Sequence, residues 1–142
     1  MNSVMTEEEK MIIDDLDNEL VKIISENENL TKYDLRLEKS FNYLSWIGTV
    51  SLDTEFRYVF LVDTVVISRV KFRNNHNGCM TRCLKSIENV AEKTNMHRII
   101  VQSVSTIEMA NWCSKMGFVP ADYYSASKVD GIPIYCDYVL KL

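Results

Sequence analysis

Glycine and proline are scarce in this chain of 142 residues, which contains four glycines and two prolines. Collagen-like, linker-rich and low-complexity proteins need these residues in quantity, so the composition excludes those classes. Glycine is costly within regular structure and is kept where the backbone needs a positive φ or a close approach. We therefore expect Gly48, Gly78, Gly117 and Gly131 to lie at junctions between elements.

Long apolar runs are also missing. No run approaches the roughly 18 residues that a membrane-spanning helix needs, and the N-terminus begins with acidic residues instead of a basic stretch followed by an apolar one. We expect a cytoplasmic protein without a membrane span or an export signal. A chain of this length normally folds as one domain, with residues 1–40 here forming an acidic helical region and residues 41–142 the sheet and its site.

Paired metal-ligand spacings are absent. The four cysteines are Cys79, Cys83, Cys113 and Cys136, and the first two, four residues apart on one expected helix, would supply at most half of a metal site. We therefore predict no metal centre. The cysteines are expected to be free thiols, mostly buried, in a reducing compartment.

Charge is distributed unevenly along the chain, whose net charge is −4. Residues 1–30 carry nine acidic residues and two lysines, whereas residues 69–98 carry seven basic residues and two acidic ones. The basic segment is either a solvated surface or a site for an anionic partner such as a phosphorylated cofactor. Nucleic acid is a less favoured partner, because an acidic chain weakens phosphate-driven binding.

The N-terminal region has the pattern of an amphipathic helix. Thr6 and Glu9 form a capping box, and apolar residues then recur at helical spacing, which predicts a helix over residues 7–28. Its other face, which includes Asp14, Asp15 and Asp17, faces solvent or forms a surface for a basic protein partner. Residues 30–40 are interpreted as a short second helix.

The rest of the chain alternates strands and helices. The stretch 41–72 is rich in aromatic and β-branched residues with two short breaks, which predicts three antiparallel strands in series. A helical stripe follows over 79–94, then a strand over 98–104 and a capping box at Ser105–Glu108 with a helix to Met116. Segments 123–129 and 132–140 then flank Asp130-Gly131, which predicts a hairpin. The expected fold class is α/β (α+β). The element order predicts a mixed, mostly antiparallel sheet of about five to six strands flanked by helices.

From Val66 to Pro120, the chain resembles the GNAT superfamily of acetyl-CoA-dependent N-acetyltransferases. The family pattern runs from an apolar strand through a loop R/Q-x-x-G-x-G/A into a helix, then through a strand and a second helix that ends in aromatic-x-x-x-G-F. Here the loop reads Asn75-His76-Asn77-Gly78-Cys79-Met80, and the second helix ends in Cys113-Ser114-Lys115-Met116-Gly117-Phe118. The resemblance implies a GNAT-like fold.

The loop carries the cofactor site that this resemblance implies. A strand that stops at a glycine-containing turn before a helix exposes backbone N–H groups and the positive end of the helix dipole, which suits a pyrophosphate. In the family this loop binds the pyrophosphate of acetyl-CoA, and the pantetheine lies along the edge of the preceding strand, which splays from the next one. With Arg73 and Arg82 added as charge partners, the expected cofactor-binding residues are Val70, Phe72, Arg73, His76, Asn77, Gly78, Cys79, Met80 and Arg82.

Several positions depart from the family pattern. Asn75 replaces Arg or Gln, and Met80 replaces a small residue, so that its side chain would crowd the cofactor. Cys113 stands at the tyrosine position whose hydroxyl is thought to protonate the leaving thiolate. A general base must be a carboxylate or an imidazole in the groove, and the candidates are His76, Asp63, Glu55 and, through water, Tyr123 or Tyr124.

Two functions follow from the resemblance. In the first, the chain binds acetyl-CoA and acetylates an amine, with Cys113 and His76 as weak catalytic candidates. Positioning and a backbone N–H that polarises the carbonyl would then supply most of the catalysis. In the second, it is a catalytically inactive GNAT-fold binding or structural protein, for example a component of a phage particle. A phage-encoded protein of this kind would be located within the virion. Its acidic N-terminal helix would contact a protein partner.

Overall fold

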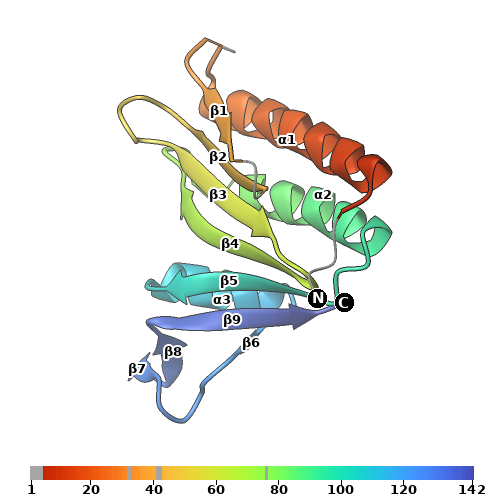
Figure 1. The fold of residues 1–142 in the computed structure, drawn as a ribbon. Coiled ribbons are helices and arrows are strands. Elements are labelled where there is room, and N and C mark those ends of the chain that lie inside the picture. Colours follow the sequence, from red (N-terminus) through yellow and green to blue (C-terminus); the bar gives the residue numbers. More distant parts are fainter. Residues whose placement is uncertain (1–4, 32, 41–42, 76) are drawn as a thin grey trace.

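The computed structural model describes residues 5–31, 33–40, 43–75 and 77–142. A seven-stranded sheet has the order β1-β2-β3-β4-β5-β9-β6, and a separate two-stranded sheet pairs β7 with β8 (Figure 1). The elements are α1 (Glu7–Glu28), β1 (Arg36–Lys39), β2 (Leu44–Gly48), β3 (Glu55–Phe60), β4 (Thr64–Lys71), α2 (Cys79–Lys93), β5 (Arg98–Val104), α3 (Ile107–Lys115), β6 (Val119–Pro120), β7 (Ser127–Val129), β8 (Ile132–Ile134) and β9 (Cys136–Lys141).

Helix α1 has the bounds that its sequence predicts. The Thr6 hydroxyl accepts a hydrogen bond from the Glu9 backbone N–H at 3.0 Å, and the Glu9 carboxylate accepts one from the Thr6 N–H at 3.0 Å. The apolar stripe of the helix is buried, and Asn29 ends it in the left-handed conformation. The capping box and the helical spacing therefore predicted this element correctly.

The expected helix over residues 30–40 is wrong, because this segment contains a turn and then strand β1. The Thr31 hydroxyl donates to the Asp34 carboxylate at 2.8 Å, which closes a local turn that competes with helix formation. Strand β1 then pairs antiparallel with β2, from Arg36 opposite Gly48 to Lys39 opposite Ser45. Together with the short strand β6, this addition brings the main sheet to seven strands where five to six were expected.

The sheet combines an antiparallel meander with a parallel crossover. Strands β2, β3 and β4 pair in series as predicted, β4 and β5 are parallel across α2, and β9 inserts between β5 and β6. Gly48 is required by a close approach, because an added Cβ would collide with the Trp46 ring and lie 2.9 Å from the Thr54 carbonyl oxygen. Of the two reasons for which glycine is kept, the close approach is therefore the one that applies at Gly48.

The C-terminal segment differs from its prediction in two details. The N-cap of α3 is Thr106, whose hydroxyl accepts from the Met109 N–H at 3.1 Å, one residue later than the predicted capping box. The hairpin at Asp130-Gly131 joins β7 to β8 as expected. Its second segment is not one strand, because Tyr135 takes a positive φ of 55° and donates its N–H to the Val104 carbonyl at 2.6 Å. Strand β9 begins after that residue.

The three helices lie on one face of the main sheet. Helices α1 and α2 lie side by side against β2–β4, and α3 lies behind β5 and β9 (Figure 1). Buried side chains of this face come from opposite positions of neighbouring strands, for example Tyr58, Ile67, Val101 and Tyr138. In the described residues no helix covers the other face, here called the open face.

Candidate functional site

Strands β4 and β5 separate halfway along their length. They pair from Thr64 opposite Arg98 to Ile67 opposite Val101, and no later pair is formed between the described residues of the two strands. A bulge marks the separation point on β4, because Arg57 faces Arg69 while Tyr58 faces Ile67, which leaves Ser68 as an extra residue. The predicted splay of this strand is therefore confirmed.

Strand β5 bends away at the same level. Ser103 has a positive φ of 52°, and its backbone N–H donates to the Asp137 carboxylate at 2.8 Å. The pairing with β9 shifts between Val101 and Val104. Distortions in both strands thus open the sheet at one place, which is a geometry that can admit a ligand between two strands.

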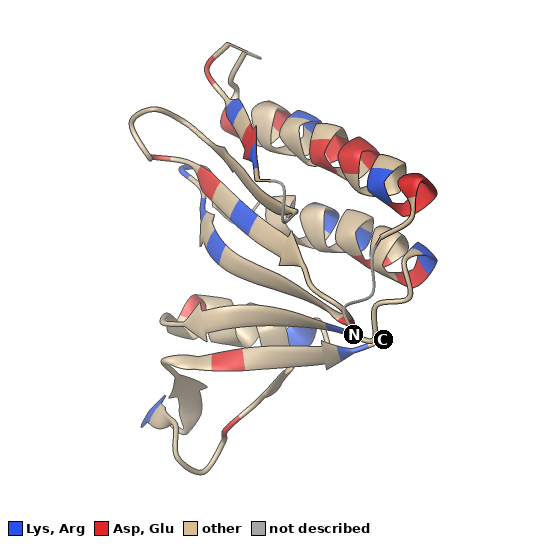
Figure 2. Ribbon diagram, in the orientation of Figure 1, with Lys and Arg blue, Asp and Glu red and all other residues tan. Residues whose placement is uncertain are grey.

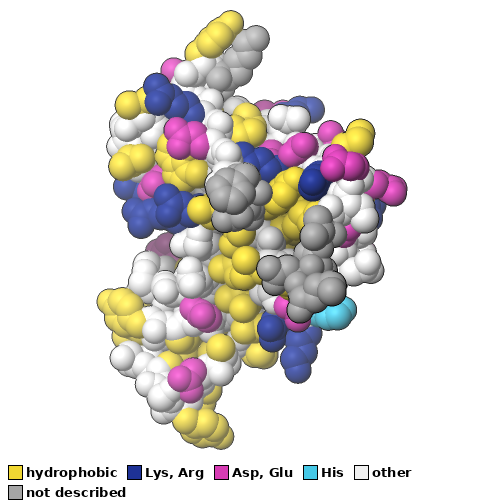
Figure 3. All heavy atoms as spheres, viewed as in Figure 1, with side chains coloured by type: hydrophobic (Ala, Val, Ile, Leu, Met, Phe, Trp, Pro, Cys, Tyr) yellow, Lys and Arg dark blue, Asp and Glu magenta, His cyan; other side chains and the backbone are white. Residues whose placement is uncertain are grey.

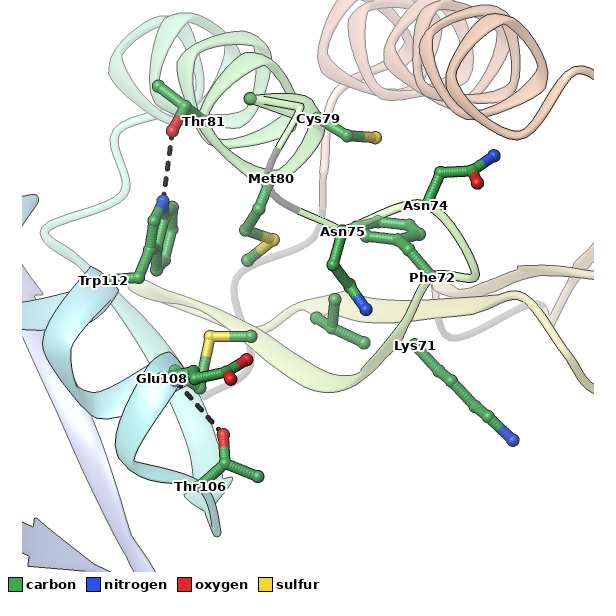
Figure 4. A pocket seen from close by; sticks show the side chains of 13 residues that line it. Lys71, Phe72, Asn74, Asn75, Cys79, Met80, Thr81, Thr106, Glu108 and Trp112 are labelled. Carbon is green, nitrogen blue, oxygen red and sulfur yellow. Dashed lines mark hydrogen bonds between the residues drawn. The ribbon is translucent and has the colours of Figure 1, made fainter.

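Two adjoining pockets occupy this opening. The first, about 350 Å³, lies between the end of β4, the loop before α2 and the first half of α3 (Figure 4). The second, also about 350 Å³, lies between the splayed parts of β4 and β5. The two share Val70, Lys71, Thr106 and Met109 as lining residues. We call the two together the cleft; it runs from the start of α2 to the gap between the strands.

The start of α2 is suited to an anion. Gly78 is its N-cap with a φ of 76°, no side chain of the described residues caps the helix, and its first turn contains no acidic residue. No atom lies within 4 Å of the position that a Cβ on Gly78 would occupy. The N–H groups of the first turn and the helix dipole therefore present positive charge to the cleft.

Met80, which was expected to crowd the cofactor, and Phe72 are two large side chains that line the groove beside Gly78. Met80 projects into the first pocket between Trp112 and Asn75 (Figure 4) and is 9% exposed. Phe72 stacks on Phe56, with ring centroids 6.3 Å apart and planes at 9°. The groove is narrowed by Met80 but is not filled.

The expected cofactor residues fall into separate places. Val70, Phe72, Gly78, Cys79 and Met80 line the first pocket. Asn77 is exposed and is not a lining residue, and His76 lies outside the described residues.

The two arginines expected to pair with a phosphate contact α1. A guanidinium nitrogen of Arg73 donates to the Glu28 carbonyl at 3.3 Å, and Arg82 pairs with the Glu26 carboxylate at 3.2 Å. Neither arginine lines the first pocket.

Cys113 lies in the core, where it is fully buried, and it lines neither pocket of the cleft. Burial raises the pKa of its thiol to about 12. From the same helix, Trp112 reaches the first pocket, where its indole N–H donates to the Thr81 hydroxyl at 3.1 Å. The helix therefore presents Trp112 to the cleft in this structure.

The candidate bases among the described residues lie outside the cleft. Glu55 is held by the Arg69 guanidinium at 2.7 Å, and Asp63 lies beside Arg98 next to the other end of β4. Tyr123 and Tyr124 are exposed and contact each other edge to face. Sequence reasoning missed the carboxylate that does line the first pocket, Glu108, although its place in the first turn after β5 was a usable signal.

The acidic face of α1 is only partly available to a partner. Asp14 and Asp15 are exposed, but Asp17 is 2% exposed and accepts hydrogen bonds from Lys39, Ser45 and Tyr58. The acidic residues along this helix are visible in Figure 2. Asp17 therefore anchors α1 to the sheet, and its expected place on the exposed face is wrong.

Other features of the described residues limit the chemistry. The four cysteines are free, and three of them are buried. In the described ranges, no group of three or more His, Cys, Asp or Glu side chains could hold a metal ion. No helix there is both long and apolar enough to cross a membrane.

Known structures share this architecture at low sequence identity. A putative acetyltransferase from Agrobacterium tumefaciens has a TM-score of 0.53 and 11% identity, over 100% of this chain and 97% of its own. The ribosomal-protein-S18-alanine N-acetyltransferase from Escherichia coli has a TM-score of 0.52 and 10% identity, over 85% and 86%. The GNAT domain of PAT from S. lividans has a TM-score of 0.50 and 14% identity, over 74% and 64%. No protein-family model and no curated protein matches the sequence. The chain therefore has the GNAT acetyltransferase fold, as its motifs predicted.

Proposed function

We propose that this chain binds acetyl-CoA in the cleft and transfers the acetyl group to an amine. The observation that carries the proposal is the continuity of the cleft, which leads from the uncapped N-terminus of α2 to the gap between β4 and β5. A thioester that extends from a pyrophosphate needs this combination of an anion site and a narrow apolar passage. Structures with this fold that carry the name acetyltransferase support the same reading.

The residues divide the binding between them. The N–H groups at the start of α2, from Gly78 to Met80, would hold the pyrophosphate. Val70 and Met109, which line both pockets, would contact the pantetheine. Beyond Ile67, the edge of β4 that faces β5 has no strand partner among the described residues, so its backbone N–H groups can polarise a thioester carbonyl.

Attack of the neutral amine forms the amide bond and breaks the thioester bond. The amine nitrogen loses one proton and the leaving thiolate takes one up, so CoA leaves as the thiol. Among the described residues, no carboxylate lines the gap between β4 and β5, and Glu108 is the carboxylate of the adjoining pocket. The proposed catalysis therefore depends mainly on holding the amine against the carbonyl. We expect the rate to rise with pH as the acceptor amine loses its proton, which for an α-amine occurs at about pH 8.

The test is CoA binding by calorimetry to the wild type, Gly78→Asn and Gly78→Asp. Asn and Asp have the same shape, and there is room for either at this position, but only the carboxylate would repel a pyrophosphate. We expect a micromolar dissociation constant for the wild type and at least about tenfold weaker binding for Gly78→Asp than for Gly78→Asn. Absence of binding at millimolar CoA would contradict the proposal.

A second function is a GNAT-fold protein without catalysis, which acts by binding another molecule. Two observations favour it: Met80 narrows the groove, and Cys113, at the position of the family's tyrosine, is buried outside the cleft. Absence of CoA binding, together with a protein partner that is lost on the charge reversals Asp14→Lys and Asp15→Lys, would select this function. Asp17 is left out of that test because it holds α1 on the sheet.

A further inference from the structure

The open face carries a group of cations at the mouth of the cleft. Side chains alternate between the two faces of a strand, so the exposed Arg69 and Lys71 lie on the open face while Val70 and Phe72 lie on the helix side. Arg69 and Lys71 also line the gap between β4 and β5. A molecule that enters this gap from the open face therefore passes both cations.

A third cation extends this group onto the neighbouring strand. Arg57 of β3 is exposed and lies directly opposite Arg69 in the register. We call Arg57, Arg69 and Lys71 the cationic rim. Figure 2 shows basic positions along the ribbons of β3 and β4, and Figure 3 shows basic side chains at the left edge of the molecule, with acidic ones beside them.

The rim holds more positive charge than its own acid neutralises. Like charges directly opposite each other on adjacent strands destabilise a sheet, and Arg57 and Arg69 are such a pair. The carboxylate of Glu55 pairs with Arg69 at 2.7 Å and accepts from the Trp46 indole at 3.3 Å, so its two oxygens are engaged. An anionic ligand would neutralise positive charge of the rim that Glu55 leaves unpaired.

The phosphates of CoA do not account for the whole rim, although Lys71 also lines the first pocket. Their expected site is the start of α2, on the helix side, whereas Arg57 lines neither of the two pockets of the cleft. Arg57 lines instead a hollow of about 740 Å³ on β1–β3, whose charged lining residues are the basic Arg36, Lys39 and Arg57 and the acidic Glu38 and Glu55. The basic residues of this hollow outnumber the acidic ones by one, and the hollow extends away from the cleft over a region larger than a small amine would occupy.

We propose that the acceptor is a peptide whose residues next to the acetylated amine are acidic; this inference rests on the function proposed above. The amine would enter the gap between β4 and β5, and the neighbouring carboxylates would meet the cationic rim. A basic acceptor would be disfavoured, because no carboxylate among the described residues lines the gap and the rim repels it.

The test measures peptide binding by calorimetry, so it does not depend on turnover. The probes are a hexapeptide with a free N-terminus followed by aspartate and glutamate, and a matched hexapeptide with lysine at each acidic position, both with saturating CoA at low salt. We expect the acidic peptide to bind at least about tenfold more tightly, with the difference falling as salt is added. Equal affinity, or tighter binding of the basic peptide, would overturn the inference, as would a single-stranded oligonucleotide that binds more tightly than the acidic peptide.

Arg57→Glu is the variant that isolates the rim. The introduced carboxylate faces Arg69, so the substitution replaces a like-charge pair with an opposite-charge pair and should not impair folding. We expect this substitution to weaken binding of the acidic peptide about tenfold and to leave the affinity for CoA unchanged. The control, Lys85→Glu, makes the same charge change at an exposed position of α2 and should leave peptide binding unchanged. Equal effects of the two variants on peptide binding would overturn the inference. Absence of CoA binding by the wild type would instead reject the proposed function.

Discussion

The carboxylate of Glu28, at the end of α1, accepts a hydrogen bond from the backbone N–H of Asn74 at 2.9 Å. It also accepts from the Arg73 N–H at 2.5 Å and from the Thr54 hydroxyl at 2.7 Å, and the side chain is 2% exposed. One buried carboxylate thereby joins α1, the turn before β3 and the loop that leads to Gly78. The position of the anion site at the start of α2 depends on this junction.

The first prediction concerns Glu28→Gln. The amide keeps the shape but places N–H donors against N–H donors, so we expect the free energy of unfolding to fall by about 1–3 kcal/mol. CoA affinity should fall as well, because the loop loses its orientation. Urea unfolding and calorimetry measure the two effects. Glu26→Gln, which removes an exposed ion pair with Arg82, is the control and should change stability by less than about 1 kcal/mol. Equal effects of the two substitutions would show that the junction is unimportant.

The second prediction concerns Met80→Ala. The buried side chain narrows the first pocket, so its removal should cost about 2 kcal/mol or more of stability and yet tighten CoA binding several-fold. Thermal unfolding and calorimetry check both. Met116→Ala is the matched control, because Met116 is half-buried and lines neither pocket of the cleft; it should lose stability without a gain in affinity. Unchanged or weaker CoA binding by Met80→Ala would count against this assignment of the groove.

The third prediction concerns Cys113. Its thiol is fully buried, and its pKa of about 12 keeps it protonated at neutral pH. We expect no alkylation of Cys113 in the folded protein at about pH 8, measured by mass spectrometry with urea-unfolded protein as the control. Cys113→Ala should lower stability and leave acetyl transfer within about twofold of the wild type. A fall of about a hundredfold in transfer with intact folding would restore this residue as the catalytic acid.

Elements specified by neighbouring residues were predictable from the sequence. The capping box at Thr6 and the helical spacing after it predicted α1, and Gly117 lies just past α3 with a φ of 93°. Each of these signals acts over a few residues, so the chain itself contains the whole pattern. The segment 30–40 shows the limit, because the contacts that make β1 a strand come from β2.

The site was predictable only in outline. The resemblance to the GNAT pattern predicted the splay of β4 and the place of Gly78, but not which side chains enter the cleft. Trp112 meets Thr81, and Glu28 meets Asn74, across long stretches of sequence. Such contacts depend on how the elements pack. No periodicity within one element indicates them.

The last prediction is a pH dependence that arises at Glu55. Burial favours the neutral acid, but the hydrogen bonds from Arg69 and Trp46 prevail and hold the pKa of Glu55 below its ordinary value of 4.5. A carboxyl whose pKa is lowered by folding contributes stability above its unfolded pKa and loses it as the pH falls through the folded pKa. Glu55→Gln should therefore be less stable than the wild type at about pH 7, by less than about 1 kcal/mol because Arg69 is 57% exposed. The difference should shrink as the pH falls below the ordinary pKa of 4.5 and vanish at the lower pH at which the folded carboxyl is protonated as well. Urea unfolding at the two pH values measures it, with the exposed Asp15→Asn as the control. A difference that persists or grows at low pH would show that the contribution of Glu55 to stability does not come from its charge.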